Sequence, residues 1–122
     1  MKISAVTLPV ACMETTVRFY LRLGFVLPRG GDQAAFTTFQ VGKQHVNLRL
    51  TDRDSSTPSQ SLTIFEVEDV DALYQSVVDK GLRPEFSPQD AEWGERYFHL
   101  RDPNGNHLSF AQRILPLFSK ST

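Results

Sequence analysis

The stretch WGERYFHLRDPNGNHLSF, Trp93–Phe110, decides the predicted fold. Two runs in which apolar and polar residues alternate, 96–101 and 107–112, flank the sequence DPNGN. In that turn Pro103 presets one backbone angle, and Gly105 supplies a positive φ. The stretch therefore predicts two antiparallel strands joined by a tight turn.

The alternation within the first of these strands assigns a face to each side chain. Phe98 and Leu100 are apolar and are expected to point toward covering helices. The opposite face then carries polar, ionisable side chains, namely Tyr97, His99 and Arg101. This second face is a candidate site.

Upstream of the hairpin, the second half of the chain has a regular order of elements. LTIFEV (62–67) reads as a strand, and a helical pattern follows, with Asp69 at its N-cap and Gly81 at its end. The segment LRPEF (82–86) is predicted to be a short strand. With the hairpin strands, this half reads βαβββ.

The first half repeats the same order. Its expected elements are a strand at 3–10, a helix at 13–24 and strands at 25–28, 34–41 and 45–50. We therefore expect a first module at about 3–51, a Ser-, Asp- and Pro-rich linker at 52–60, a second module at about 61–113 and a tail at 114–122.

A unit of about sixty residues buries too little apolar surface to be stable alone. The two modules are therefore expected to pair within a single domain, 1–122. The predicted fold class is α+β: two βαβββ modules pair into a curved mixed sheet around a cavity, with the helices on the outer face.

The composition excludes several classes of protein. The chain has 122 residues, of which 40% are hydrophobic, and its net charge is -1. This charge offers no broad basic field for nucleic acid or an anionic membrane, and no apolar run is long enough to span a bilayer. Cys12 is the only cysteine, which excludes an intrachain disulfide and favours the cytoplasm.

Three segments in order, FYLRLGF (19–25), FEVEDVDALY (65–74) and the hairpin stretch, resemble the vicinal oxygen chelate superfamily. This superfamily includes glyoxalase I, fosfomycin-resistance transferases, extradiol dioxygenases and bleomycin-resistance proteins. The resemblance covers about residues 3–113 and implies paired βαβββ modules, a cavity on the concave sheet and a homodimer. In such a dimer the modules either pair within one chain or are exchanged between the two chains. It does not select an activity, because one fold hosts many functions.

The resemblance also implies a divalent metal held by His and Glu, which a substrate with two neighbouring oxygens would chelate. The corresponding positions in this chain are Ala5, Arg49, Leu62 and Ser109. None of these side chains is a suitable ligand, and the fixed cation of Arg49 would repel a metal ion. We therefore predict no metal and no cofactor.

The predicted polar faces supply a candidate ligand site, made of Thr7, Asn47, Arg49, Trp93, Tyr97, His99, Arg101 and Ser109. Arg49 would grip a carboxylate or phosphate, and Trp93 and Tyr97 would stack on a ring. A small-molecule ligand that is aromatic or anionic is therefore expected. Bleomycin is cationic, and this set contains no acidic residue, which argues against bleomycin itself.

The leading interpretation is a metal-free small-molecule-binding protein that sequesters its ligand in the cavity. The alternative is an enzyme: a metal-dependent or His99-based lyase, isomerase, thiol transferase or dioxygenase, with His99 as general base and Arg49 as oxyanion partner. A scaffold module, in which side chains fill the cavity, is a third possibility, since any sheet can turn a polar face to solvent. His107, directly after the turn, is expected to be exposed.

Overall fold

The structure is a computed structural model that describes residues 1–52 and 61–114. The chain divides into two compact units: unit 1 is Met1–Ser61 with Asp102–Asn106, and unit 2 is the remainder. Most of the predicted linker and nearly all of the predicted tail fall outside the described residues. No helix in the described part is long and apolar enough to cross a membrane.

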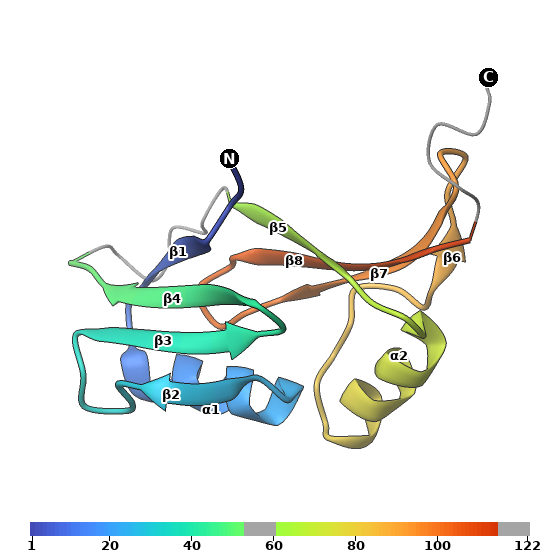
Figure 1. Cartoon of the computed structure of the whole chain (residues 1–122). Helices are drawn as coiled ribbons and strands as arrows, with labels where there is room; N and C mark the ends of the chain where they lie inside the picture. Colours follow the sequence, from blue (N-terminus) through green and yellow to red (C-terminus); the bar gives the residue numbers. More distant parts are fainter. Residues whose placement is uncertain (53–60, 115–122) are drawn as a thin grey trace. The chain divides into compact units, whose positions relative to one another are not determined.

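Unit 1 contains a four-stranded mixed sheet and one helix (Figure 1). In chain order its elements are β1 (Ala5–Val10), α1 (Met13–Leu23), β2 (Val26–Arg29), β3 (Phe36–Val41) and β4 (Gln44–Leu50). The strand order is β1-β4-β3-β2, with β1 parallel to β4 and the remaining pairs antiparallel.

Helix α1 covers the apolar face of this sheet. Tyr20 is fully buried, and its ring contacts those of Phe25 and Phe39 at centroid distances of 5.3 and 5.6 Å. Gly24, at φ 109°, ends the helix in the left-handed conformation that glycine adopts without strain. Leu21, the residue after Tyr20 along the helix, is exposed.

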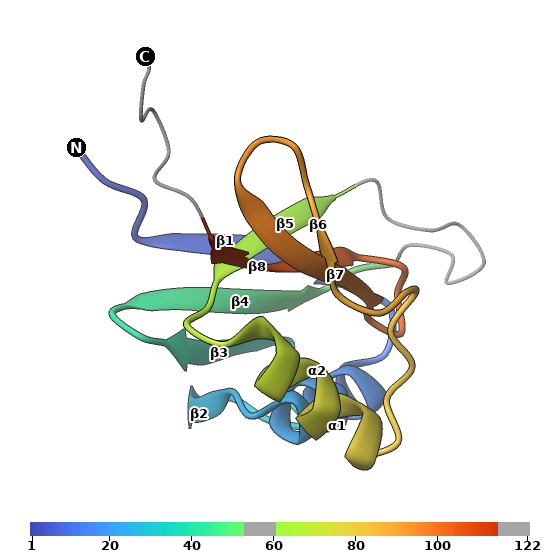
Figure 2. The same ribbon diagram turned by 90° about the vertical axis from the view of Figure 1, so that its right-hand side faces the viewer.

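Unit 2 repeats the arrangement. Its elements are β5 (Leu62–Glu66), α2 (Val70–Asp79), β6 (Gln89–Asp90), β7 (Glu95–Arg101) and β8 (His107–Arg113), in the sheet order β5-β8-β7-β6. The loop from β6 to β7, orange in Figure 2, projects beyond the strands and carries Trp93. The short strand predicted at 82–86 is wrong, because the second strand of the module is β6.

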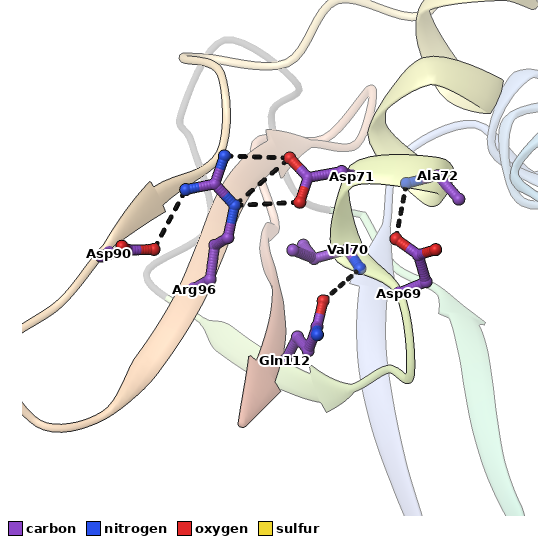
Figure 3. A network of polar contacts seen from close by, with 7 residues as sticks. All are labelled: Asp69, Val70, Asp71, Ala72, Asp90, Arg96 and Gln112. Atoms are coloured by element: carbon purple, nitrogen blue, oxygen red, sulfur yellow. Dashed lines mark hydrogen bonds and ion pairs between the residues drawn. The ribbon is translucent and has the colours of Figure 1, made fainter. Parts of the chain in front are cut away.

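Two polar contacts hold the first turn of α2 against β7 and β8 (Figure 3). The Arg96 guanidinium donates to both carboxylate oxygens of Asp71 and, at 3.0 Å, to Asp90 on β6. Gln112 on β8 accepts a hydrogen bond from the backbone N–H of Val70 at 2.9 Å. The hydrogen bonds from Arg96 lower the pKa of Asp71. Arg96 thus ties the β6–β7 hairpin to the helix.

The predicted α+β fold of two βαβββ modules is confirmed, as is the N-cap at Asp69, whose side chain accepts from the Ala72 N–H at 3.0 Å. Each helix covers the apolar face of its own sheet: Tyr74 of α2 contacts Phe98 of β7 at 5.4 Å. The pairing of the modules around a cavity and the single domain with its predicted boundaries stay predictions.

The turn between β7 and β8 belongs to unit 1, where the carboxylate of Asp102 organises it. Asp102 is 5% exposed. Its Oδ2 accepts from the Tyr20 hydroxyl at 2.8 Å and from the Asn106 side chain at 2.8 Å. Its Oδ1 accepts from the backbone N–H groups of Asn104 and Asn106. Burial is the main cause that raises the pKa of Tyr20, and the charge and hydrogen bond of Asp102 raise it further.

We expect Asp102→Ala to lower the free energy of unfolding by about 3–5 kcal/mol, because it leaves a buried tyrosine hydroxyl and two turn N–H groups without their acceptor. Asp32→Ala is the matched control. It removes the same group from a half-exposed ion pair with Arg18 and should change stability by less than about 1 kcal/mol. Urea denaturation measures both, and equal losses would contradict this role of Asp102.

Candidate functional site

The sheet of unit 1 has an open face on the side away from α1. Strand register places its side chains in rows, with Thr7 and Thr38 on either side of Asn47. We call this surface the first open face, and it consists of Ala5, Thr7, Phe36, Thr38, His45, Asn47 and Arg49.

Asn47 is the centre of a hydrogen-bonded row across three strands. The Thr38 hydroxyl donates to Asn47 Oδ1 at 2.9 Å, and Asn47 Nδ2 donates to Thr7 Oγ1 at 3.2 Å. Thr7 and Asn47, both expected at the site, are thus brought together, and Thr38 joins them. The row holds the amide in one orientation, which preorganises a polar surface.

A shallow hollow of about 420 Å³ opens on this face, lined by Ala5, Pro28, Arg29, Phe36, Thr38, His45 and Asn47. Its volume is in the range of small-molecule sites. Arg49 lies one row farther along β4, opposite Phe36 and Pro9. It is exposed and forms no ion pair with any residue in 1–52 or 61–114. Its guanidinium is therefore available to an anionic group.

Unit 2 has a corresponding surface, which we call the second open face. It consists of Leu62, Ile64, Tyr97, His99, Arg101, His107 and Ser109. Phe98 and Leu100 are buried on the other side of β7, as the alternation predicted. Ser109, an expected ligand residue, is only 5% exposed and lies between Ile64 and His99 in the strand register.

Aromatic rings form a continuous row on this face, which we call the aromatic row. The Trp93 and Tyr97 centroids are 5.8 Å apart, and those of Tyr97 and His99 are 5.3 Å apart. Phe86 contacts both Tyr97 and His99, at 5.6 and 5.1 Å. Trp93 is 61% exposed, and its indole N–H donates to Glu95 at 2.7 Å. The row offers exposed ring surface in a defined orientation.

One carboxylate, Glu85, gathers the polar side chains at the other end of the row. Its Oε2 accepts from Arg101 Nε at 3.0 Å, and its Oε1 lies 3.1 Å from His107 Nε2 and 3.9 Å from His99 Nδ1. A backbone hydrogen bond from the Glu85 N–H to the His99 carbonyl, at 2.9 Å, positions the segment. Burial opposes ionisation of Glu85, but Arg101 and His107 outweigh it and lower the pKa.

His99 is half-buried among these groups. The pKa of His99 is lowered, and burial is the largest cause. The charge of His107 also lowers this pKa, and the charge of Glu85 opposes both effects by raising it. The neutral imidazole is therefore favoured at neutral pH. The expectation that His107 is simply exposed needs correction, because its side chain is held by Glu85 and its ring lies 5.9 Å from that of His99.

The positions at which the resemblance implies metal ligands do not fit a metal. They carry a methyl, a guanidinium, an isobutyl and a buried hydroxyl group, at Ala5, Arg49, Leu62 and Ser109. Across the described residues, no three or more His, Cys, Asp or Glu side chains are grouped so that they could hold a metal ion.

Sequence reasoning missed Glu85, Phe86 and the role of His107. Glu85 and Phe86 lie in the segment 82–86, for which the sequence pattern predicts a strand and only Pro84 indicates irregular pairing. With Glu85 and Glu95 present, the surface is mixed in charge rather than free of acid. The surface therefore also carries carboxylates that a cationic ligand could contact.

Comparison with known proteins places this geometry in a family. Residues 2–110 match the Glyoxalase/Bleomycin resistance protein/Dioxygenase superfamily. A bleomycin resistance protein of Geobacillus stearothermophilus is 31% identical, over 88% of this chain and 93% of the relative.

Solved structures agree on the fold. A bleomycin-binding protein complexed with bleomycin superposes with a TM-score of 0.77 at 23% identity, covering 93% of this chain and 99% of the other. A bleomycin resistance determinant encoded on the transposon Tn5 superposes with a TM-score of 0.79 at 22% identity, covering 94% and 100%. The chain therefore belongs to the Glyoxalase/Bleomycin resistance protein/Dioxygenase superfamily.

Proposed function

We propose that this protein is a metal-free small-molecule-binding protein that sequesters its ligand on the open faces of its sheets. The observation that carries the proposal is the aromatic row, in which a largely exposed Trp93 is held in ring contact with Tyr97. Exposed, oriented aromatic surface is typical of binding sites. The relatives named for bleomycin resistance, and the absence of a suitable donor set at the expected metal positions, support the same function.

The side chains suggest the chemistry of the ligand. On the second open face, a flat ring would stack on Trp93 and Tyr97, and an anionic or hydrogen-bond-accepting group would pair with Arg101. Arg49 offers a separate guanidinium to an anionic group on the first open face. We expect the protein to act as a homodimer in the cytoplasm, an expectation that rests on the family resemblance and on the lone Cys12.

We expect the protein to bind 1-naphthamide or bleomycin saturably in equilibrium dialysis, and to release it unchanged by mass spectrometry. Trp93→Ala should weaken binding roughly three- to tenfold, the loss of one aromatic contact. Leu21→Ala removes an exposed apolar side chain from α1 and is the control that should leave affinity unchanged. Metal analysis of the purified protein should find no stoichiometric ion.

Two results would overturn this function. The first is an absence of saturable binding by naphthamide, naphthoate and bleomycin alike. The second is a stoichiometric metal ion whose removal abolishes binding.

Arg101 gives a second prediction, which concerns charge. Arg101→Ala should weaken binding of 1-naphthoate about tenfold at pH 7 and leave the affinity for 1-naphthamide unchanged, because only the carboxylate can pair with the guanidinium. Arg22→Ala, on the last turn of α1, is the control that should leave both affinities unchanged. An equal loss of affinity for both probes would contradict the charge pairing and would mean that Arg101 acts through packing alone.

One observation favours the enzymatic alternative: His99 is kept neutral, as a general base must be, and lies beside the carboxylate of Glu85. The two functions differ in turnover. We expect no consumption of α-keto aldehyde–thiol adducts or catechols by the protein. Turnover by metal-depleted protein that His99→Asn abolishes, with the urea midpoint unchanged, would establish the enzyme instead.

A further inference from the structure

Glu85, His99, Arg101 and His107 form a compact group on the second open face, which we call the Glu85 cluster. We propose that this cluster is a protonation-dependent subsite for the anionic group of an aromatic ligand. The proposal rests on the proposed function and adds to it the charge of the ligand and the control of binding by pH.

Glu85 supplies a negative charge within the cluster. Its two carboxylate oxygens already contact Arg101 Nε and His107 Nε2, at 3.0 and 3.1 Å. With neutral imidazoles the charges of Glu85 and Arg101 cancel, so the cluster has no net charge. An external anion then meets no net attraction at the cluster.

The second step concerns the donors that remain. Only Nε of Arg101 is hydrogen-bonded to a described residue, so its two terminal nitrogens have no partner in the part of the chain that the structure describes. The side chain is about half exposed. These nitrogens can bind a carboxylate in a bidentate manner without displacing Glu85.

The third step is the uptake of protons. Histidine changes charge between about pH 5 and 8, whereas an ordinary carboxylic acid stays ionised above about pH 5. A proton taken up by His99 adds one positive charge beside Arg101. An anionic ligand therefore binds more tightly as the pH falls, and a neutral ligand of the same shape does not.

The groups that face His99 and His107 come from the neighbouring segments of unit 2. Glu85, Arg101 and Tyr97 are their charged or titratable neighbours, and β5 adds only Leu62 and Ile64 beside them. Helix α2 packs on the opposite face of the sheet, against Phe98. The Glu66–Arg113 ion pair lies at the far end of the strands.

The cluster also adjoins the aromatic row, which gives the subsite its ligand class. The His99 ring contacts both Tyr97, at 5.3 Å, and His107, at 5.9 Å. A ring stacked on the row is thus next to the cluster, so its acidic substituent can reach Arg101 and the two imidazoles. An aromatic carboxylate satisfies both features at once.

The charge coupling is tested by following the histidine ring protons by NMR as the pH is varied. We expect the pKa of His99 to lie below the ordinary histidine value because of burial. Glu85→Gln should lower it further, since the charge of Glu85 raises it, and His107→Asn should raise it. Glu68→Gln, the same change at an exposed position before α2, should have no effect. An unchanged His99 pKa in Glu85→Gln would overturn the cluster.

The binding test compares 1-naphthoate with 1-naphthamide by equilibrium dialysis between pH 8 and 5.5. We expect naphthoate affinity to rise about tenfold over this range, as one added charge predicts, and naphthamide affinity to stay constant. Glu85→Gln should bind naphthoate more tightly at pH 8, because it removes the competing anion. The double variant His99→Asn, His107→Asn should lose the rise.

A pH-independent naphthoate affinity, a rise shared by naphthamide, or a rise kept by the double variant would each overturn the subsite. If naphthamide still binds and Trp93→Ala weakens it, the proposed function stands without the subsite. If the double variant does not fold, Glu85→Gln decides: naphthoate affinity no higher than that of the original protein at pH 8 overturns the proposal.

Discussion

The buried carboxylate of Asp102 is the constraint on which unit 1 and the hairpin depend. It accepts hydrogen bonds from Tyr20, from the Asn106 side chain and from two turn N–H groups. No buried side-chain nitrogen or oxygen of the turn lacks a hydrogen-bond partner. The turn itself belongs to unit 1, although it connects β7 to β8 of unit 2. The DPNGN segment has the sequence of an ordinary hairpin turn, and it also completes the core of unit 1. Removing the buried Asp102 carboxylate should lower the free energy of unfolding far more than removing an exposed carboxylate.

The recognition groups lie on the face of each sheet that the helix leaves open. This follows from the alternation of side chains along a strand, since the face that packs on a helix must be apolar. On unit 1 the open face is polar and hydrogen-bonded around Asn47, whereas on unit 2 it combines rings with the Glu85 cluster. Two copies of one topology have thus acquired different chemistry, because open-face residues are less constrained by packing than core residues.

Membership in the superfamily does not itself assign an activity, because a fold positions side chains and the side chains perform the chemistry. In this chain the positions that would hold a catalytic metal carry groups such as the Arg49 guanidinium, which favours an anion instead. The proposed binding function draws its support from the aromatic row and from the terminal nitrogens of Arg101, which have no partner among the described residues. In the proposed subsite, proton uptake by His99 makes pH, as well as shape, a determinant of which ligands are held.

The sequence by itself determined the secondary structure of most of both modules and the side on which each strand residue lies. These features follow from short-range rules: alternation placed His99 opposite Phe98, and the N-cap preference of Asp69 began α2. Only the tertiary structure decided that Glu85 meets Arg101, His107 and His99. Glu85 lies in a segment without periodicity, and a backbone hydrogen bond to His99, fourteen residues along the chain, sets its position. No local rule encodes such a contact, because its geometry depends on the path of the whole chain between the two residues.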